Sequence, residues 1–198
     1  MIDWLLNLDN ELFFFLNGLH NSWMDTIMWH ISGKWQWVPF YVLLLFYIIK
    51  TYKKQSVYLL LALTCVIICS DFIASGIFKP YFERLRPTHD SRWEGMVHIV
   101  NGYKGGRYGF ASSHAANTFG LATMIFFIFR SIYRITPIIF LWAIIVSYSR
   151  IYLGVHYPLD IITGGAIGLI IGWTFYSIAK RFIHLSEIKL NQKDHESD

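Results

Sequence analysis

Five long apolar runs constrain the fold of this chain more than any other feature. They cover residues 35–49, 57–78, 112–129, 136–149 and 158–178. A helix needs about 20 predominantly apolar residues to cross a bilayer, and each run with its flanks approaches that length. Charged residues make up only 15% of the chain, against roughly a quarter of an ordinary soluble domain. The sequence therefore predicts an integral membrane protein of the all-α class, folded as one polytopic helical bundle.

The first 32 residues are apolar but carry several polar side chains. These are Asp3, Asp9, Glu11, Asn17, His20 and Asp25. The segment is compatible with a short first span, a re-entrant hairpin or an interfacial helix, and we favour a first span. The start of the chain lacks the basic residues and cleavage site of a signal peptide, so we expect it to be retained. We assign residues 1–183 to a single membrane domain and residues 184–198 to a polar cytoplasmic tail.

Basic residues follow alternate apolar runs. They lie within residues 50–54, 130–134 and 180–181. Because cytoplasmic connections are enriched in lysine and arginine, these three segments are predicted on the cytoplasmic side. The polar segments 79–111 and 150–157 must then lie together at the outer face. The 79–111 segment is also basic, which suggests that its charges are kept for chemistry.

The segment between the last two runs carries a hydroxyl, a guanidinium, an imidazole and a carboxylate. They belong to Ser149, Arg150, His156 and Asp160. A spacing of four places His156 and Asp160 on one face of a helix. Asp160 would then accept a hydrogen bond from one imidazole nitrogen and leave the other nitrogen free to act as a nucleophile or a base. Arg150 favours an anionic reaction partner.

Two further clusters carry groups that suit a phosphate. Lys79 and Arg86 stand in one, and Ser112, Ser113 and His114 stand in the other. A phosphoryl group in transfer spreads negative charge over its oxygens, so its site needs fixed cations and N–H donors. The two serines fall at a predicted helix start, where hydroxyls and free backbone N–H groups form an anion site. His114 lies in the first turn, where it can protonate a leaving oxygen.

The chain resembles the type 2 phosphatidic acid phosphatase family, which comprises integral-membrane lipid phosphatases related to vanadium haloperoxidases. The motifs of that family are K-x6-R-P, P-S-G-H and S-R-x5-H-x3-D. The first and third are complete, as Lys79, Arg86 and Pro87 and as Ser149, Arg150, His156 and Asp160. The second stands as Ala111-Ser112-Ser113-His114, so its proline and glycine are replaced. A serine at the glycine position would be strained if that position required a positive φ.

The resemblance implies about six transmembrane helices and metal-independent hydrolysis of a lipid phosphomonoester or pyrophosphate, with no cofactor. It implies that His156 attacks phosphorus to form a phosphohistidine and that Asp160 orients His156. His114 would protonate the leaving group and later activate water. The residues that the resemblance assigns to phosphate binding are Lys79, Arg86, Ser112, Ser113 and Arg150. The residues alone leave open whether His156 is a nucleophile or a base.

The expected partner is a phosphorylated membrane lipid and not a nucleic acid. A bacterial chain of this kind fits the cytoplasmic (inner) membrane, with its site facing the periplasm or exterior. We expect undecaprenyl diphosphate as the substrate because an outward-facing site suits its recycling, and lipid A and phosphatidylglycerophosphate are the alternatives. Loop residues that can choose among these lipids are Glu83, Arg84, Arg92, Trp93, Glu94, Tyr103, Lys104 and Arg107.

Other interpretations remain open from the sequence. A transporter or lipid binder would hold a phosphate headgroup without hydrolysing it, although two histidines and an orienting carboxylate argue for chemistry. A phosphotransferase would differ only in its acceptor. A metal on His89, Asp90 and His98 is a further alternative, although exposed loop residues are the simpler interpretation. A soluble haloperoxidase is excluded by the apolar runs, and the sequence does not indicate an oligomeric state.

Overall fold

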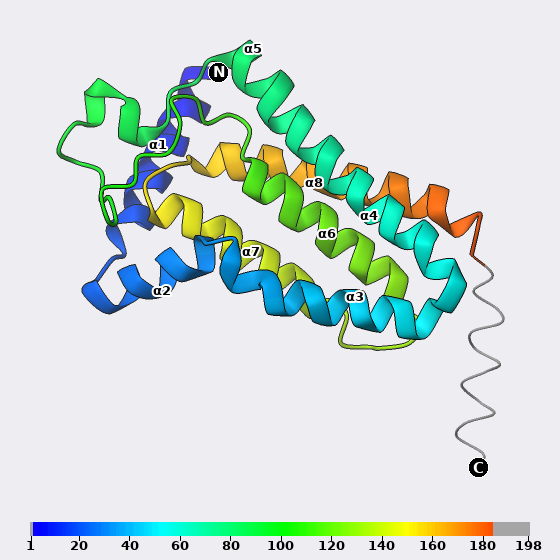
Figure 1. Cartoon of the computed structure of the whole chain (residues 1–198). Helices are drawn as coiled ribbons and strands as arrows, with labels where there is room; N and C mark the ends of the chain where they lie inside the picture. The colour runs from blue at the N-terminus through cyan, green and yellow to red at the C-terminus, as the bar shows by residue number, and fades with distance from the viewer. Residues whose placement is uncertain (1, 184–198) are drawn as a thin grey trace.

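Figure 1 shows the computed structural model, which describes residues 2–183. The predicted all-α architecture is confirmed, because these residues form helices and no named strand. The α-helices are α1 Ile2–Gly18, α2 Ser22–Ser32, α3 Val38–Tyr52, α4 Ser56–Asp71, α5 Lys79–Phe82, α6 Ser113–Phe129, α7 Ile138–Tyr152 and α8 Pro158–Lys180. A π-helical segment, Phe72–Phe78, joins α4 to α5. The predicted polar tail, residues 184–198, lies outside the described residues.

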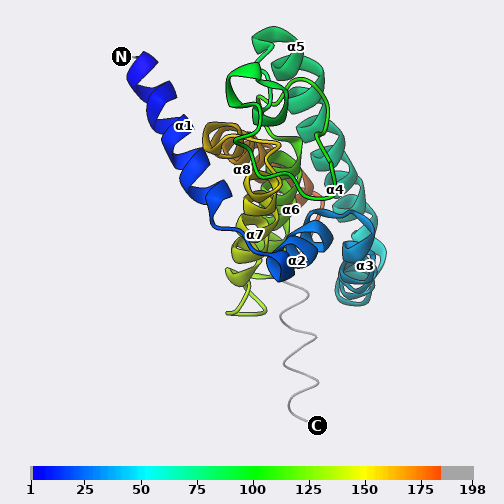
Figure 2. The same cartoon turned by 90° about the vertical axis from the view of Figure 1, so that its left-hand side faces the viewer.

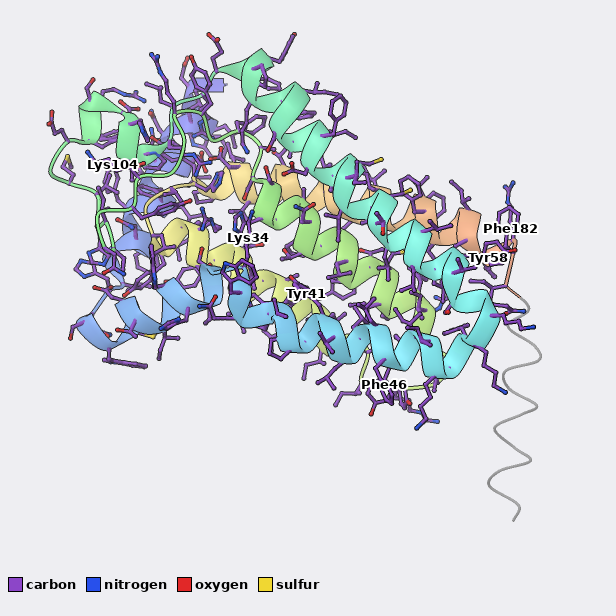
Figure 3. The ribbon with its side chains drawn as sticks, viewed as in Figure 1. Lys34, Tyr41, Phe46, Tyr58, Lys104 and Phe182 are labelled. Carbon is purple, nitrogen blue, oxygen red and sulfur yellow. The ribbon has the colours of Figure 1, made fainter. Side chains whose placement is uncertain are left out.

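The first two apolar runs form an antiparallel hairpin of α3 and α4. The chain reverses at Lys53, whose φ is +48°, and α4 then returns beside α3 (Figure 1). The stretch Trp35–Phe82, which contains the α3–α4 hairpin, and the single helix Pro158–Lys180 are long and apolar enough to cross a membrane, while α6 and α7 are shorter apolar helices. The outward side of the hairpin is apolar, as Phe46 in Figure 3 illustrates. An exposed apolar surface of this extent fits a lipid environment.

Glycines allow α6 and α8 to pack closely. Gly164, Gly168 and Gly172 lie four residues apart, on one face of α8. A Cβ atom on each would collide with a backbone carbonyl oxygen of Ser112, Ala116 and Gly120, respectively. The predicted small-residue face is therefore the contact that fixes α8 against the first half of α6.

Residues 1–32 do not form the single first span that we favoured. They form two helices, α1 and α2, of 17 and 11 residues. The break is local, because the Asn21 side chain accepts a hydrogen bond from the Met24 backbone N–H and so caps a new helix. The Asn17 amide donates to the carbonyl oxygens of Ile151 and Tyr152. The Asn17 contacts hold the end of α1 against the end of α7. In Figures 1 and 2, α1 lies at this end of the bundle.

The two ends of the bundle differ in chemistry. The turn between α3 and α4, the turn between α6 and α7 and the end of α8 lie at one end (Figure 1). These are the three basic segments that the sequence predicted on the cytoplasmic side. The opposite end holds the long connection 83–112, the start of α6, the end of α7 and the start of α8. All three sequence motifs therefore meet at this end.

Candidate active site

Helix termini bring the second and third motifs together. Ser112 is the N-cap of α6, and its hydroxyl accepts a hydrogen bond from the Ala115 backbone N–H at 3.4 Å. Its own backbone N–H donates to the Asp160 carbonyl oxygen at 2.9 Å. Ser113 is the first residue of α6, and it is not among the described non-glycine residues with a positive φ. Serine therefore fits the position where the family motif has glycine.

His156 and Asp160 form the predicted pair. His156 Nδ1 lies 3.2 Å from Asp160 Oδ2, and the two residues are 2% and 0% exposed. The helix begins at Pro158, between them, and Asp160 Oδ2 also accepts the Tyr157 backbone N–H at 3.0 Å. Because Nδ1 faces the carboxylate, Nε2 is left for chemistry.

The surroundings of His156 keep its imidazole neutral. Burial lowers the pKa of His156 well below its ordinary value, and the positive charges of Arg86, Arg150 and Lys79 lower that pKa further. A neutral imidazole that uses Nδ1 as the donor carries its lone pair on Nε2. The site therefore presents an unprotonated nitrogen to a bound electrophile at neutral pH.

Two guanidinium groups next to this pair have donors without partners. Arg86 and Arg150 are 8% and 3% exposed. Arg86 Nε donates to the Tyr108 carbonyl oxygen at 3.1 Å, while Arg150 donates to the Ser32 hydroxyl and to Tyr103 Oη. Arg86 Nη1 and Arg150 Nε are buried and have no hydrogen-bond partner among the described residues. Buried donors without acceptors are costly, so this arrangement suits a bound oxyanion.

The positive charges of these two arginines repel each other. Burial lowers the pKa of Arg86 below its ordinary value, and the nearby charge of Arg150 lowers it further. Gly105, with φ +67°, lets the backbone approach the Arg86 guanidinium, because a Cβ there would lie 2.6 Å from Nη1. An anion placed between the guanidinium groups would relieve their repulsion.

Lys79 lies against α6 rather than in open solvent. Its Nζ donates to the hydroxyls of Ser75 and Ser113, each at 2.8 Å. The same two hydroxyls lie 2.6 Å apart. Ser75 comes from the π-helical segment before α5, where the wider turn places it one turn before Lys79. Sequence reasoning missed Ser75, since a single serine in an apolar run gives no signal.

His114 lies in the first turn of α6, as predicted, and is half-buried. Its imidazole makes no hydrogen bond to another of residues 2–183. The ring lines a cavity of about 560 Å³ between α3, α4, α6 and α7. Most of the lining is apolar, and it includes Tyr41, Leu44, Leu60, Leu63, Leu121, Trp142 and Val146. A hydrocarbon chain of a bound ligand can therefore lie in this cavity, next to the His114 imidazole.

Arg84 and Asp9 belong to the site although the sequence did not assign them to it. Arg84 Nη1 donates to Asp160 Oδ1 at 2.9 Å, and Nη2 donates to Asp9 Oδ2 at 2.5 Å. Asp9 Oδ1 also accepts the Leu159 backbone N–H at 2.8 Å. We had expected Arg84 to be one of the loop residues that select the lipid. Its guanidinium binds the Asp160 carboxylate through Oδ1, the oxygen that does not contact His156, because the connection 83–112 folds back over the start of α8.

The residues considered for a metal do not gather in one place. His98 Nε2 lies 2.8 Å from Asp25 Oδ1, and its ring stacks on His20. The Asp90 carboxylate is bound to Arg92 instead, whose Nε and Nη2 both donate to Asp90 Oδ2. In the part of the chain that the structure describes, no three His, Cys, Asp or Glu side chains form a group that could hold a metal ion.

Comparisons with known proteins identify the family of the chain. The sequence model of the PAP2 superfamily matches residues 57–183. The chain belongs to this superfamily and is a membrane lipid phosphatase.

The chain is 39% identical over 183 residues to a lipid A 4'-phosphatase of Bacteroides thetaiotaomicron, covering 91% of this chain and 81% of the relative. It is 28% identical over 168 residues to an undecaprenyl-diphosphatase of Sulfolobus acidocaldarius, covering 80% and 72% of the two chains. The fold is similar to the crystal structure of a transmembrane PAP2-type phosphatidylglycerolphosphate phosphatase from Bacillus subtilis. That similarity has a TM-score of 0.69 at 18% identity and covers 91% of this chain and 89% of the other.

Proposed function

We propose that this protein removes a phosphate monoester from lipid A, as a lipid A 4'-phosphatase. The observation that carries this proposal is the similarity to a lipid A 4'-phosphatase along nine-tenths of the chain. The weaker similarity to an undecaprenyl-diphosphatase makes our first expectation, undecaprenyl diphosphate, the less supported substrate. The apolar cavity beside His114 supports a substrate that carries hydrocarbon chains.

In this proposal His156 is the nucleophile. Its Nε2 lone pair attacks phosphorus, a P–N bond forms, and the bond from phosphorus to the sugar oxygen breaks. The Asp160 carboxylate accepts a hydrogen bond from the His156 Nδ1–H and stabilises the imidazolium that develops. His114 gives a proton to the leaving oxygen. It then takes a proton from the water that hydrolyses the phosphohistidine and releases phosphate.

The unpartnered arginine donors are proposed to bind the phosphoryl oxygens. Arg86 and Arg150 each have a buried N–H without an acceptor, and a phosphoryl group would supply the acceptors in a place closed to water. Lys79 adds a third positive charge, which its hydrogen bond to the Ser113 hydroxyl holds at the start of α6. The Ser112 hydroxyl, together with the hydroxyl and backbone N–H of Ser113, adds donors at the start of α6, whereas the Ser112 backbone N–H is already bound to the Asp160 carbonyl oxygen.

We further propose that this end of the bundle faces the periplasm or exterior of the cytoplasmic membrane. The basic turns at the opposite end support a cytoplasmic position for that end. Lipid substrates would then enter from the outer leaflet, with the phosphate at the membrane surface and one acyl chain in the cavity.

The test is phosphate release by the purified protein in detergent. Lipid A, undecaprenyl diphosphate and phosphatidylglycerophosphate are compared at matched concentrations, with and without excess chelator. We expect the highest kcat/KM for lipid A, no effect of the chelator and loss of release in His156→Ala. A higher kcat/KM for undecaprenyl diphosphate would overturn the proposed substrate, and full activity of His156→Ala would overturn the proposed nucleophile.

A further inference from the structure

The mouth of the apolar cavity carries polar groups that the proposed phosphate chemistry does not use. His114 lies at this mouth, together with Lys34 and Asn117. Lys34 belongs to the corner between α2 and α3, and Figure 3 shows its side chain pointing toward α6. Asn117 follows His114 by three residues on α6, so the two share one helix face, with Asn117 deeper in the bundle.

Lys34 is a cation without a counter-ion. Among residues 2–183 no carboxylate lies within salt-bridge distance of its ammonium group, whereas Arg84 and Arg92 both have carboxylate partners. Lys34 follows Ser32 by two residues, and the Ser32 hydroxyl accepts a hydrogen bond from Arg150, so Lys34 lies on the Arg150 side of the site. Lys34 is exposed, so water solvates its ammonium group when no ligand is bound, and the group is available to an acceptor on a ligand.

Asn117 has an acceptor that lacks a donor. Its Oδ1 atom is buried and has no hydrogen-bond partner among the described residues. An amide oxygen in such a place needs a donor. A ligand that satisfies both side chains must therefore offer an acceptor to Lys34 and a donor to Asn117.

This requirement distinguishes two kinds of leaving group. An acylated amino sugar offers hydroxyl and amide donors as well as carbonyl and hydroxyl acceptors. The proximal phosphate of a prenyl diphosphate, once ionised, offers acceptors only, and it would place negative charge against the Asn117 oxygen. The mouth of the cavity therefore fits a sugar better than a second phosphate.

We propose that Lys34 and Asn117 form a leaving-group subsite that binds the acylated sugar of a phosphorylated glycolipid. The subsite rests on the proposed function, because it lies where the oxygen protonated by His114 would leave. It deepens that function by assigning the choice of leaving group to two residues outside the family motifs.

The test measures binding of the leaving group without its phosphate. Lipid A from which the phosphate has been removed is used as an inhibitor of p-nitrophenyl phosphate hydrolysis, in mixed micelles of fixed composition. We expect Lys34→Ala and Asn117→Leu each to raise the inhibition constant about tenfold, the loss expected for a hydrogen bond to a charged or buried group. Lys50→Ala, at the other end of α3, is the matched control and should leave the constant unchanged.

Each result decides the proposal. Equal inhibition constants in the wild type and both variants would overturn the subsite, as would absence of inhibition in the wild type. Undecaprenyl phosphate is tested as a second inhibitor. If its inhibition constant rises by the same factor in both variants, the subsite binds phosphate and the sugar assignment is wrong. If the wild type releases no phosphate from lipid A but its inhibition by the product depends on Lys34 and Asn117, the proposed function fails and the subsite stands.

Discussion

Arg84 forms ion pairs with two buried carboxylates that come from distant parts of the chain, Asp9 and Asp160. The guanidinium also lies over the Tyr157 ring, 4.1 Å from its centroid. Asp160 in turn contacts His156, so Arg84 acts on the proposed nucleophile through another residue. This makes Arg84 a positioning residue in our interpretation, and its charge is one of those that lower the pKa of His156.

We expect Arg84→Ala to lower kcat/KM and to shift its acid limb to higher pH. Removal of a positive charge raises the pKa of His156, and the protonated imidazole has no lone pair for attack, so activity is lost at a higher pH than in the wild type. The two carboxylates left unpaired should cost about 3–5 kcal/mol of unfolding free energy. Arg84→Lys should recover part of both effects. A pH–rate profile corrected for ionisation of the substrate is the measurement, and an unshifted acid limb would leave Arg84 a purely structural role.

At the scale of elements, the α6–α8 contact sets the distance between the proposed acid and the proposed nucleophile. His114 belongs to α6, and Asp160, which contacts the proposed nucleophile His156, belongs to α8. The glycine face of α8 holds these helices together. Gly168→Ala should push the helices apart, because the new Cβ meets backbone that cannot rotate away. We expect a loss of about 1–3 kcal/mol in unfolding free energy together with a lower kcat.

Gly18→Ala is the matched control, since nothing lies within 4 Å of a Cβ at the end of α1. Thermal unfolding in detergent and turnover of lipid A measure the two effects. Wild-type stability and turnover in Gly168→Ala would show that the glycine face is not required.

The helices that carry the motifs could be predicted from the sequence because their signals are local. Apolar runs, a cap at Ser112 and the four-residue spacing of His156 and Asp160 all depend on neighbouring residues. The contacts made by Arg84, Ser75 and Asp9 could not be predicted in this way. The contact of Ser75 with Ser113 depends on how the π-helical segment packs against α6. The contacts of Arg84 and Asp9 join segments whose relative position is fixed only when α1 lies across the bundle and the 83–112 connection folds over it. The failure to place α1 was therefore also the reason that Asp9 was missed.

At the scale of the whole molecule, the separation of the basic turns from the site predicts which end faces outward. Lys53 lies in the turn between α3 and α4, and Lys104 lies in the connection over the site, at the other end of the bundle (Figure 3). If cytoplasmic turns retain the positive charge, a cysteine at position 104 should react from outside intact cells with a membrane-impermeant maleimide. A cysteine at position 53 should react only after the cells are opened.

Both substitutions are best made in a chain in which Cys65 and Cys69 are replaced by serine, since these are free thiols in α4. Each variant must first retain phosphatase activity, which shows that the bundle is intact. Labelling of position 53 alone from outside would reverse the orientation and place phosphate release in the cytoplasm. Labelling of both positions from one side would mean that the turn at Lys53 and the site share one face of the membrane, which would contradict the arrangement of α3 and α4 as spans.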